Sequence, residues 1–385
     1  HGIPAFRLPP EALQRDLERV FAMGVSFRGG QVFGSDITAA GLLADGFGAV
    51  CLAVGAHRPH ELAIAGAGEA GAPPLVAGLS WLADLAAGQD AAAERVSVAG
   101  QQVVVIGGGN TAVDAARSAL RLGAATVVVA CLEARDAMPA LAEEIDAAHA
   151  EGVLIRAGHR PTSLGQGALI LESLVDGAAL HLAADLVVVA IGQRPDGEAL
   201  AAGLQDAALD EDGCLPADGS TCATAWPKVF AAGDLTAGER TVTAAIASGQ
   251  RAAWAMDRQL RGEVAADRRP PPALTRRPAP LPPLVLPQRS RHGAPELAPN
   301  RRRADFDEVM GTFDEATAQA EASRCLLCGR CGVCRLCIDL LGCPGFKVEG
   351  DGHIAIEASL CSGCGVCAEL CPSGAIGPDG TLGVS

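Results

Sequence analysis

The sequence predicts an α/β fold with parallel sheets, followed by a small cysteine-rich domain of the α+β class. Short apolar stretches of strand length alternate with stretches of helical periodicity. A glycine-rich turn joins one of these strands to the helix after it, and ten of the 14 cysteines lie between Cys325 and Cys371. With 385 residues, 49% hydrophobic and 19% charged, the chain is expected to form several domains, each with its own core.

The first predicted element is a helix from Pro10 to Met23, because apolar residues recur at helical spacing between Leu13 and Phe21. Strands and helices alternate after it, which is typical of parallel α/β sheets. The expected strands are Ala49–Val54, Val98–Ile106, Thr126–Ala130, Leu186–Ile191 and Val229–Ala232, and the expected helices are Ala112–Leu122 and Leu141–Ala150.

From Arg261 to Arg303 the composition changes, since ten of the 24 prolines lie here among many arginines. This composition predicts an extended connector or a tail packed on the α/β body. Thr312 and Glu315 have the spacing of a capping box, which predicts a short helix up to Ser323 that leads into the cysteine-rich part.

Composition and charge exclude some classes of function. Tyrosine is absent, aromatic residues total 3% and the net charge is −15, so a nucleic-acid partner is not expected. No apolar run reaches the ~18 residues of a membrane span. The cysteines cluster in a large chain without a secretion signal, so we expect a cytoplasmic protein whose thiols bind metal.

The cysteine spacings predict two [4Fe-4S] clusters. The last four cysteines follow the bacterial ferredoxin pattern C-x2-C-x2-C-x3-C-P, and the run before them has the same plan with a longer last gap. The fourth cysteine of each run ligates the other cluster in such proteins. One cluster is therefore expected on Cys331, Cys334, Cys337 and Cys371, and the other on Cys361, Cys364, Cys367 and Cys343.

A zinc ribbon is the structural alternative, but it uses two CxxC pairs rather than triplets closed by Cys-Pro. Cys325 and Cys328 are surplus to the two clusters. They could replace members of the first run, or reach a cluster on another domain or chain.

A dinucleotide-binding fingerprint follows the strand that ends at Ile106. Gly107-Gly108-Gly109-Asn110-Thr111-Ala112 reads G-x-G-x-x-A between a strand and a helix, as a Rossmann-like domain requires. The first glycine allows the tight turn, the third lets the backbone approach the pyrophosphate, and the helix N-terminus attracts its charge. The alternative is a tight turn without a ligand.

Glu133 follows the next strand, where an acidic residue can accept bonds from the ribose hydroxyls and would repel a 2′-phosphate. It therefore favours NADH over NADPH. Arg135 is the opposing observation, since it could reach a phosphate, and Glu133 could equally be a solvated loop carboxylate.

Three signatures occur in order: His1 to Pro9 (HGIPAFRLP), Gly107 to Ala112, and Phe230 to Asp234 (FAAGD). With them the chain resembles the glutamate synthase small subunit family and its relatives, such as dihydropyrimidine dehydrogenase and electron-bifurcating transhydrogenases. The resemblance extends up to the Pro-rich connector and resumes at EASRCLLC, residues 321–328. The double-cluster part is more similar to that of indolepyruvate ferredoxin oxidoreductase.

The resemblance implies an FAD domain interrupted by a nicotinamide domain. By position, it implies that Arg7, Val32 and Gly55 line the FAD, and that Asp234 after Gly233 bonds the ribityl chain. It also implies that a helix opening at Thr241 and Val242 points its amides at the flavin, where its dipole would stabilise the reduced form. Ala190, Ile191 and Gly192 would form the strand end between the two nucleotide sites.

The sequence departs from this family at two points. NADPH-dependent members usually have paired arginines where this chain has Leu132 and Glu133, which again favours NADH. The family's first FAD fingerprint, which should precede His1, is not in the sequence. We expect a fragment of a longer protein, the alternative being a separate chain that completes the FAD site.

The predicted organisation has five parts: part of an FAD domain (residues 1–97), an NAD(P)-binding Rossmann-like domain (98–195), the return segment of the FAD domain (196–260), a linker (261–311) and a 2×[4Fe-4S] ferredoxin-like domain (312–385). The predicted function is electron transfer between NAD(P)H, FAD and the two clusters, with ferredoxin or a catalytic subunit as partner. No acid–base side chain is required, so none is predicted as catalytic. The alternatives are a non-catalytic electron-relay subunit and, less favoured, a thioredoxin-reductase-type disulfide reductase.

Overall fold

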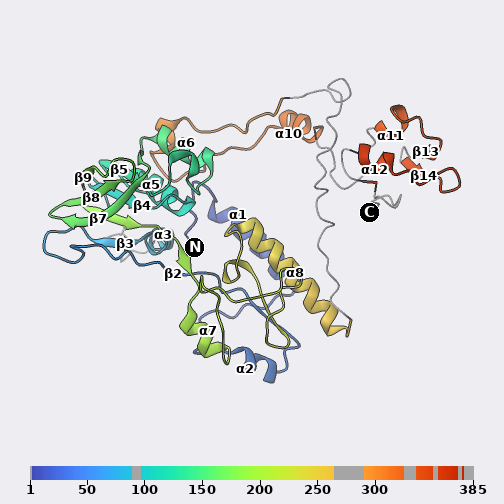
Figure 1. The fold of residues 1–385 in the computed structure, drawn as a ribbon, viewed down its shortest axis with the longest axis horizontal. Coiled ribbons are helices and arrows are strands. Elements are labelled where there is room, and N and C mark those ends of the chain that lie inside the picture. The colour runs from blue at the N-terminus through green and yellow to red at the C-terminus, as the bar shows by residue number, and fades with distance from the viewer. Residues whose placement is uncertain are drawn as a thin grey trace. The chain divides into compact units, whose positions relative to one another are not determined.

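The computed structural model describes residues 2–88, 97–263, 290–324, 335–349, 354–371 and 375–376 (Figure 1). The chain divides into two compact units. The first comprises residues 1–268 and 296–310, and the second comprises residues 269–295 and 311–385. Cys325, Cys328, Cys331 and Cys334 lie outside the described residues.

A five-stranded parallel sheet forms the larger part of the first unit, here called the five-stranded region (residues 74–192). Its strand order is β3 (Leu75–Ala77), β10 (Leu186–Val189), β4 (Gln102–Ile106), β5 (Thr126–Ala130) and β6 (Leu154–Arg156). All four neighbouring pairs are parallel, as the alternating pattern predicts. The sheet includes residues before 98, the expected domain boundary, because β3 pairs with β10.

Helices cover one face of this sheet. They are α3 (Gly78–Ala87), α5 (Asn110–Arg121) and α6 (Ala142–Glu151), and they share one apolar core with Val103, Val105, Val127 and Val129. The facing side of α5 consists largely of alanines, four of which are completely buried. Small side chains there let the helix pack close to the sheet, which is what the fingerprint requires of its last position.

A second sheet covers the opposite face. The strands β7 (His159–Gly165), β8 (Ala168–Ser173) and β9 (Ala179–Ala183) are antiparallel. Leu169 and Leu171 of β8 are completely buried against Val104 and Val128 of the parallel sheet. The sequence analysis did not predict this sheet. It explains why the parallel strands are almost continuously apolar, since they are covered on both faces.

The second part of the first unit is the two-stranded region (residues 10–60 and 193–263). Its parallel strands are β1 (Val50–Leu52) and β12 (Val229–Ala231). The helices α2 (Ala39–Ala44), α7 (Gly197–Gly203) and α8 (Val242–Leu260) and the short 3-10 helix η2 (Gly233–Leu235) belong to it. Two short antiparallel strands, β2 (Arg58–Pro59) and β11 (Gln193–Arg194), pair where the chain passes between the two regions.

The predicted N-terminal helix is present as α1 (Pro10–Ala22), but its apolar side is not buried by the described residues. The side chains of Leu13, Leu17, Val20 and Phe21 are between 40% and 47% exposed. The apolar spacing therefore predicts the helix correctly, but the described residues form no core against which its apolar side packs.

The second unit begins with α10 (Glu315–Ala322). The predicted capping box is wrong: Asp314, not Thr312, is the N-cap, and its side chain accepts a bond from the Thr317 N–H at 2.8 Å. An aspartate next to the first turn satisfies the same free N–H groups. The remaining elements are α11 (Leu336–Asp339), α12 (Val366–Leu370) and an antiparallel pair, β13 (Phe346–Val348) and β14 (Ile354–Ile356). Among the described residues, no helix is both long and apolar enough to cross a bilayer.

Candidate functional site: a dinucleotide cavity and a cysteine-rich unit

A cavity of about 560 Å³ lies at the carboxyl ends of β4, β5 and β10. In open α/β sheets ligands bind at this edge, where neighbouring strands lead the chain in opposite directions. Most of the residues predicted to bind the dinucleotide line it together: Gly107, Gly108, Gly109, Thr111, Glu133, Ala190, Ile191 and Gly192.

The glycine turn fits a dinucleotide pyrophosphate. Gly107 has φ +135°, and a Cβ there would lie 2.2 Å from the Ala190 carbonyl oxygen. A side chain is therefore excluded both by backbone conformation and by the neighbouring strand. At Gly109, in contrast, a Cβ would meet nothing within 4 Å. The open space at the start of α5 is where a phosphate would accept bonds from helix N–H groups.

Asn110 has a structural role that the sequence analysis did not anticipate. Its Oδ1 accepts a bond from the Leu141 N–H at 3.1 Å, and the nearby Ala140 N–H donates to the Gly108 carbonyl at 3.0 Å. These two bonds fasten the loop before α6 to the glycine turn. Asn110 does not line the cavity, so its side chain supports the glycine turn without facing the ligand space.

Glu133 folds over the glycine turn. Its Oε2 lies 2.8 Å from where a Cβ of Gly108 would be, which places a carboxylate in the cavity beside the turn. Arg135, the opposing cation, pairs with Asp146 of α6 at 3.4 Å and does not line the cavity. The carboxylate is thus better placed than Arg135 to meet a bound ribose.

Several lining residues were missed because they come from elements that the sequence did not reveal. β7 contributes His159, Arg160 and Pro161, and Arg160 is paired with Glu172 of β8 at 2.7 Å. The other missed residues of the lining are Leu62, Ile106, Ala130, Cys131, Leu132 and Pro139. Burial, followed by the nearby charge of Glu133, raises the pKa of the Cys131 thiol to about 11, so this thiol is protonated at neutral pH.

The residues of the two-stranded region that the resemblance links to FAD lie at one edge. β1 and β12 are parallel and in register, so Gly55 and Gly233 follow neighbouring strand ends. Gly233 has φ +68°, and its N–H donates to Ser248 Oγ of α8 at 2.9 Å. Thr241 is the N-cap of α8, and its side chain accepts from the Ala244 N–H at 3.1 Å. The predicted helix start at Thr241 and Val242 is confirmed, and Asp234 lies beside it in η2.

Two other residues that the resemblance links to FAD are placed differently. The Arg7 guanidinium donates to both oxygens of Asp114 in α5 at 2.9 Å and lies 3.3 Å from a Glu144 oxygen of α6. It therefore contacts the five-stranded region. Val32 is 58% exposed, and its N–H donates to Asp36 at 2.7 Å. A role of either residue in FAD binding stays a prediction.

In the second unit, one apolar cluster includes Cys337, Cys367 and Cys371, which the sequence assigns to two different iron–sulfur clusters. Cys343 Sγ and the Cys361 backbone lie beside Gly345. The Gly363 N–H donates to Cys361 Sγ at 3.4 Å and the Ala375 N–H to Cys371 Sγ at 3.3 Å, bonds that tune iron–sulfur clusters. No three His, Cys, Asp or Glu side chains in the described ranges converge as they would on a single metal ion. The thiolates of a cubane bind four different irons and so need not converge on one point. The ligand assignment stays a prediction.

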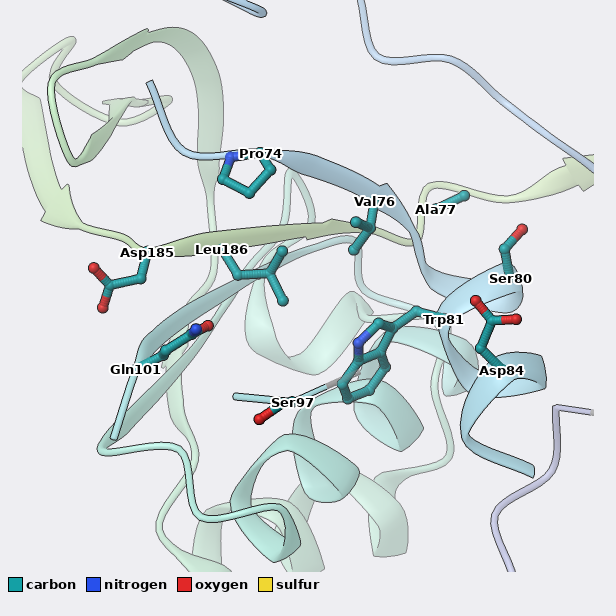
Figure 2. Close-up of a pocket in the computed structure, with 10 residues that line it drawn as sticks. All are labelled: Pro74, Val76, Ala77, Ser80, Trp81, Asp84, Ser97, Gln101, Asp185 and Leu186. Atoms are coloured by element: carbon teal, nitrogen blue, oxygen red, sulfur yellow. The ribbon is translucent and has the colours of Figure 1, made fainter. Parts of the chain in front are cut away.

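A second cavity of about 560 Å³ lies at the amino ends of β4 and β10, beside α3 (Figure 2). Its polar residues include Asp84, Asp185 and Gln101, and Figure 2 shows the Trp81 ring at its wall. It is at the opposite end of the sheet from the glycine turn and holds none of the predicted site residues.

Comparison with known proteins places this arrangement in a family. Residues 17–249 match the family described as pyridine nucleotide-disulphide oxidoreductase. The chain belongs to that family. Within the second unit, residues 354–377 match the 4Fe-4S binding domain, which confirms the class of cluster predicted from the cysteine spacing.

Relatives agree with both matches. The chain is 34% identical to the NADP(+)-dependent formate dehydrogenase subunit beta of Moorella thermoacetica, over 86% of this chain and 49% of that protein. It is 30% identical to an NADPH-Fe(3+) oxidoreductase subunit beta of Geobacter sulfurreducens, over 86% and 55%. It is 32% identical to the glutamate synthase [NADPH] small chain of Escherichia coli, over 66% and 58%.

These matches confirm the resemblance to the glutamate synthase small subunit family and the α/β fold class with a ferredoxin-like part. The number of clusters stays a prediction. The chain spans about half the length of the first two of these pyridine nucleotide-disulphide oxidoreductase relatives.

Proposed function

We propose that this chain transfers electrons from a nicotinamide dinucleotide to FAD and onward to two [4Fe-4S] clusters. The observation that carries the proposal is the cavity in which the glycine turn, Glu133 and the Ala190–Gly192 strand end meet. The family match and the 4Fe-4S match support the same chemistry.

NADH is the proposed dinucleotide. The Glu133 carboxylate beside Gly108 would accept bonds from the ribose hydroxyls and repel a 2′-phosphate. Of the nearby cations, Arg135 is paired with Asp146, and Arg160 is paired with Glu172. The three relatives above carry NADP(+) or NADPH in their names, so the preference for NADH rests on Glu133 and its surroundings in this chain.

FAD is proposed to bind where β1 and β12 end. Gly55 and Gly233 would allow its close approach, and the N-terminus of α8 would stabilise negative charge on the reduced flavin. The described residues form part of such a pocket. The exposed apolar side of α1 supports the proposal that a further segment or chain covers this region and supplies the rest.

Bound FAD would accept two electrons at once and release them singly, which suits one-electron carriers. The protein's own contribution is to hold the dinucleotide with α5 and Glu133, and to hold the clusters with the eight predicted cysteines. The partner proposed for the clusters is a ferredoxin or a catalytic subunit. The relatives' names as subunits or chains support an electron-transfer partner.

The experiment uses full-length protein purified without oxygen. We expect FAD and about eight irons per chain, and faster flavin reduction by NADH than by NADPH. Glu133→Gln should reduce the preference for NADH over NADPH by about 5-fold or more, because two like charges ~4 Å apart repel by about 1 kcal/mol in water and by more in a protein. Asp136→Asn, an exposed carboxylate three residues away, is the control and should change nothing.

Dominant use of NADPH by the wild type would contradict the role of Glu133, and zinc or about four irons or fewer would contradict the two clusters. Clusters without flavin would favour the alternative, a subunit that only relays electrons. A disulfide reductase needs a thiol pair beside the flavin. Cys131 is the one cysteine between residues 75 and 192 in the sequence, and its thiol is buried and protonated.

A further inference from the structure

The chain returns to the five-stranded region immediately before the cysteine-rich unit. Residues 296–310, here called the clasp, belong to the first unit and include α9 (Pro299–Arg302). The Val309 N–H donates to the Phe6 carbonyl at 3.0 Å, and the Leu297 N–H donates to the Val309 carbonyl at 3.0 Å. Val309 is buried, with 6% of its surface exposed. The clasp is therefore fastened to the N-terminal segment by backbone bonds and apolar contact.

Phe6 connects the clasp to the nucleotide-binding helix. Its ring is 1% exposed and lies 6.1 Å from the Phe306 ring of the clasp. The guanidinium carbons of Arg121 and Arg117, both on α5, lie 3.8 and 4.7 Å from its centroid. Such cation–π contacts stabilise a buried ring.

The two arginines are themselves held in place. Arg117 and Arg121 pair with Glu151 of α6 at 2.7 and 2.8 Å, and all three side chains are at most 3% exposed. The two arginines contact the Phe6 ring, and the Phe6 ring contacts Phe306 of the clasp. The clasp is therefore connected through Phe6 to a buried part of α5. The amino end of the same helix forms the dinucleotide cavity.

We propose that Phe306 and Val309 are positioning residues for electron transfer. They attach the chain that leads to the iron–sulfur unit, here called the tether, to the dinucleotide-binding region. The inference rests on the proposed function. Cys337, a predicted cluster ligand, follows Met310 by 27 residues and the end of α8 at Leu260 by 77 residues. When the clasp is attached, the tether begins at Met310 rather than at Leu260. A shorter length of chain then separates the clusters from the flavin.

The expected gain follows from the effective concentration of a tethered partner. This concentration falls with about the −3/2 power of the length of the connecting chain. Shortening from 77 to 27 residues then raises it by about 5-fold. Releasing the clasp should lower the rate of cluster reduction by a factor of that size and leave reduction of the flavin by NADH unchanged.

The first test needs no bound cofactor. In Phe306→Ala with Val309→Ala, hydrogen exchange of the amides at 297 and 309 should accelerate at least 10-fold, because their bonds open. Glu308→Ala is the matched control, since its exposed side chain lies between the two. Unchanged exchange in the double variant would overturn the proposal.

The second test follows both steps in full-length protein without oxygen, after rapid mixing with NADH. We expect flavin reduction at the wild-type rate and cluster reduction slowed about 5-fold in the double variant, with Phe306→Leu close to wild type. Cluster reduction at the wild-type rate despite faster exchange would overturn the proposal, and so would equal slowing of both steps. Absence of flavin reduction in the wild type would instead contradict the proposed function, while the exchange test would still report on the clasp.

Discussion

The five-stranded and two-stranded regions of the first unit differ in how completely they are built. In the five-stranded region both faces of the sheet are covered, by helices on one side and by β7, β8 and β9 on the other. In the two-stranded region the structure describes a single pair of parallel strands, and α1 has no buried residue. Met23 and Phe27, after α1, are 77% and 78% exposed.

This difference indicates which of the two nucleotide sites the described residues can form by themselves. A parallel sheet is stable when its faces are covered, and a two-stranded sheet needs packing against helices. Leu200 of α7 and Ala252 of α8 supply such packing to β1 and β12. Apart from Leu62, the dinucleotide cavity is lined by residues of the five-stranded region, whereas Gly55, Gly233 and the start of α8 would form one edge of the proposed FAD site. Three pairs of substitutions sharpen this comparison.

The largest effect is expected in the buried ion cluster of the five-stranded region. Glu151→Ala removes the carboxylate shared by Arg117 and Arg121 and leaves Arg117 with Glu144 only, so it should lower the free energy of unfolding by about 3–5 kcal/mol. Glu172→Ala breaks the exposed pair with Arg160 and should cost less than about 1 kcal/mol. Urea unfolding measures both, and equal losses would show that the cluster does not stabilise this region.

A smaller effect is expected from shortening an apolar side chain, and its size should differ between the regions. Leu169→Ala, at a completely buried position of β8, should lower the free energy of unfolding by about 2–5 kcal/mol. Leu17→Ala, on the exposed side of α1, should change stability by less than about 1 kcal/mol in this chain. A large loss for Leu17→Ala would mean that α1 already has a partner, for instance a second copy, which sedimentation would detect.

The smallest effect concerns the contact between the N-terminal segment and α5. Burial raises the pKa of Asp114 from 3.8 to about 6, against the opposing effect of Arg7, while Glu144 raises it and Arg117 lowers it. A raised carboxyl pKa means that the folded state favours the protonated form. This contribution to stability is present below about pH 4 and is lost as the pH rises through about 6.

Asp114→Asn should therefore flatten the dependence of stability on pH between about 4 and 7, by on the order of 1–3 kcal/mol. Thermal unfolding across that range provides the measurement. Asp16→Asn, on the exposed side of α1, is the control and should leave the slope unchanged. An unchanged slope in Asp114→Asn would contradict the raised pKa.

Local spacing predicted some parts of the molecule closely. The strand Thr126–Ala130 was expected with the bounds that the structure shows, whereas the helix start at Thr241 and Val242 was implied by the family resemblance. The antiparallel sheet of β7, β8 and β9 was not expected, although Gly165-Gln166-Gly167 and Asp176-Gly177 are turn signals between its strands. The N-cap at Asp314 was missed because Thr312 also had a suitable partner three residues on.

The sequence by itself determined the features that depend on neighbours along the chain: the glycine turn before α5, the acidic residue after β5, and the cysteine spacings. Only the tertiary structure decided the contacts between distant residues. Arg7 and Asp114 are 107 positions apart, and Asn110 and Leu141 are 31 apart. Backbone conformation and ligand spacing are local properties, whereas the partner of a buried charge depends on which elements pack together.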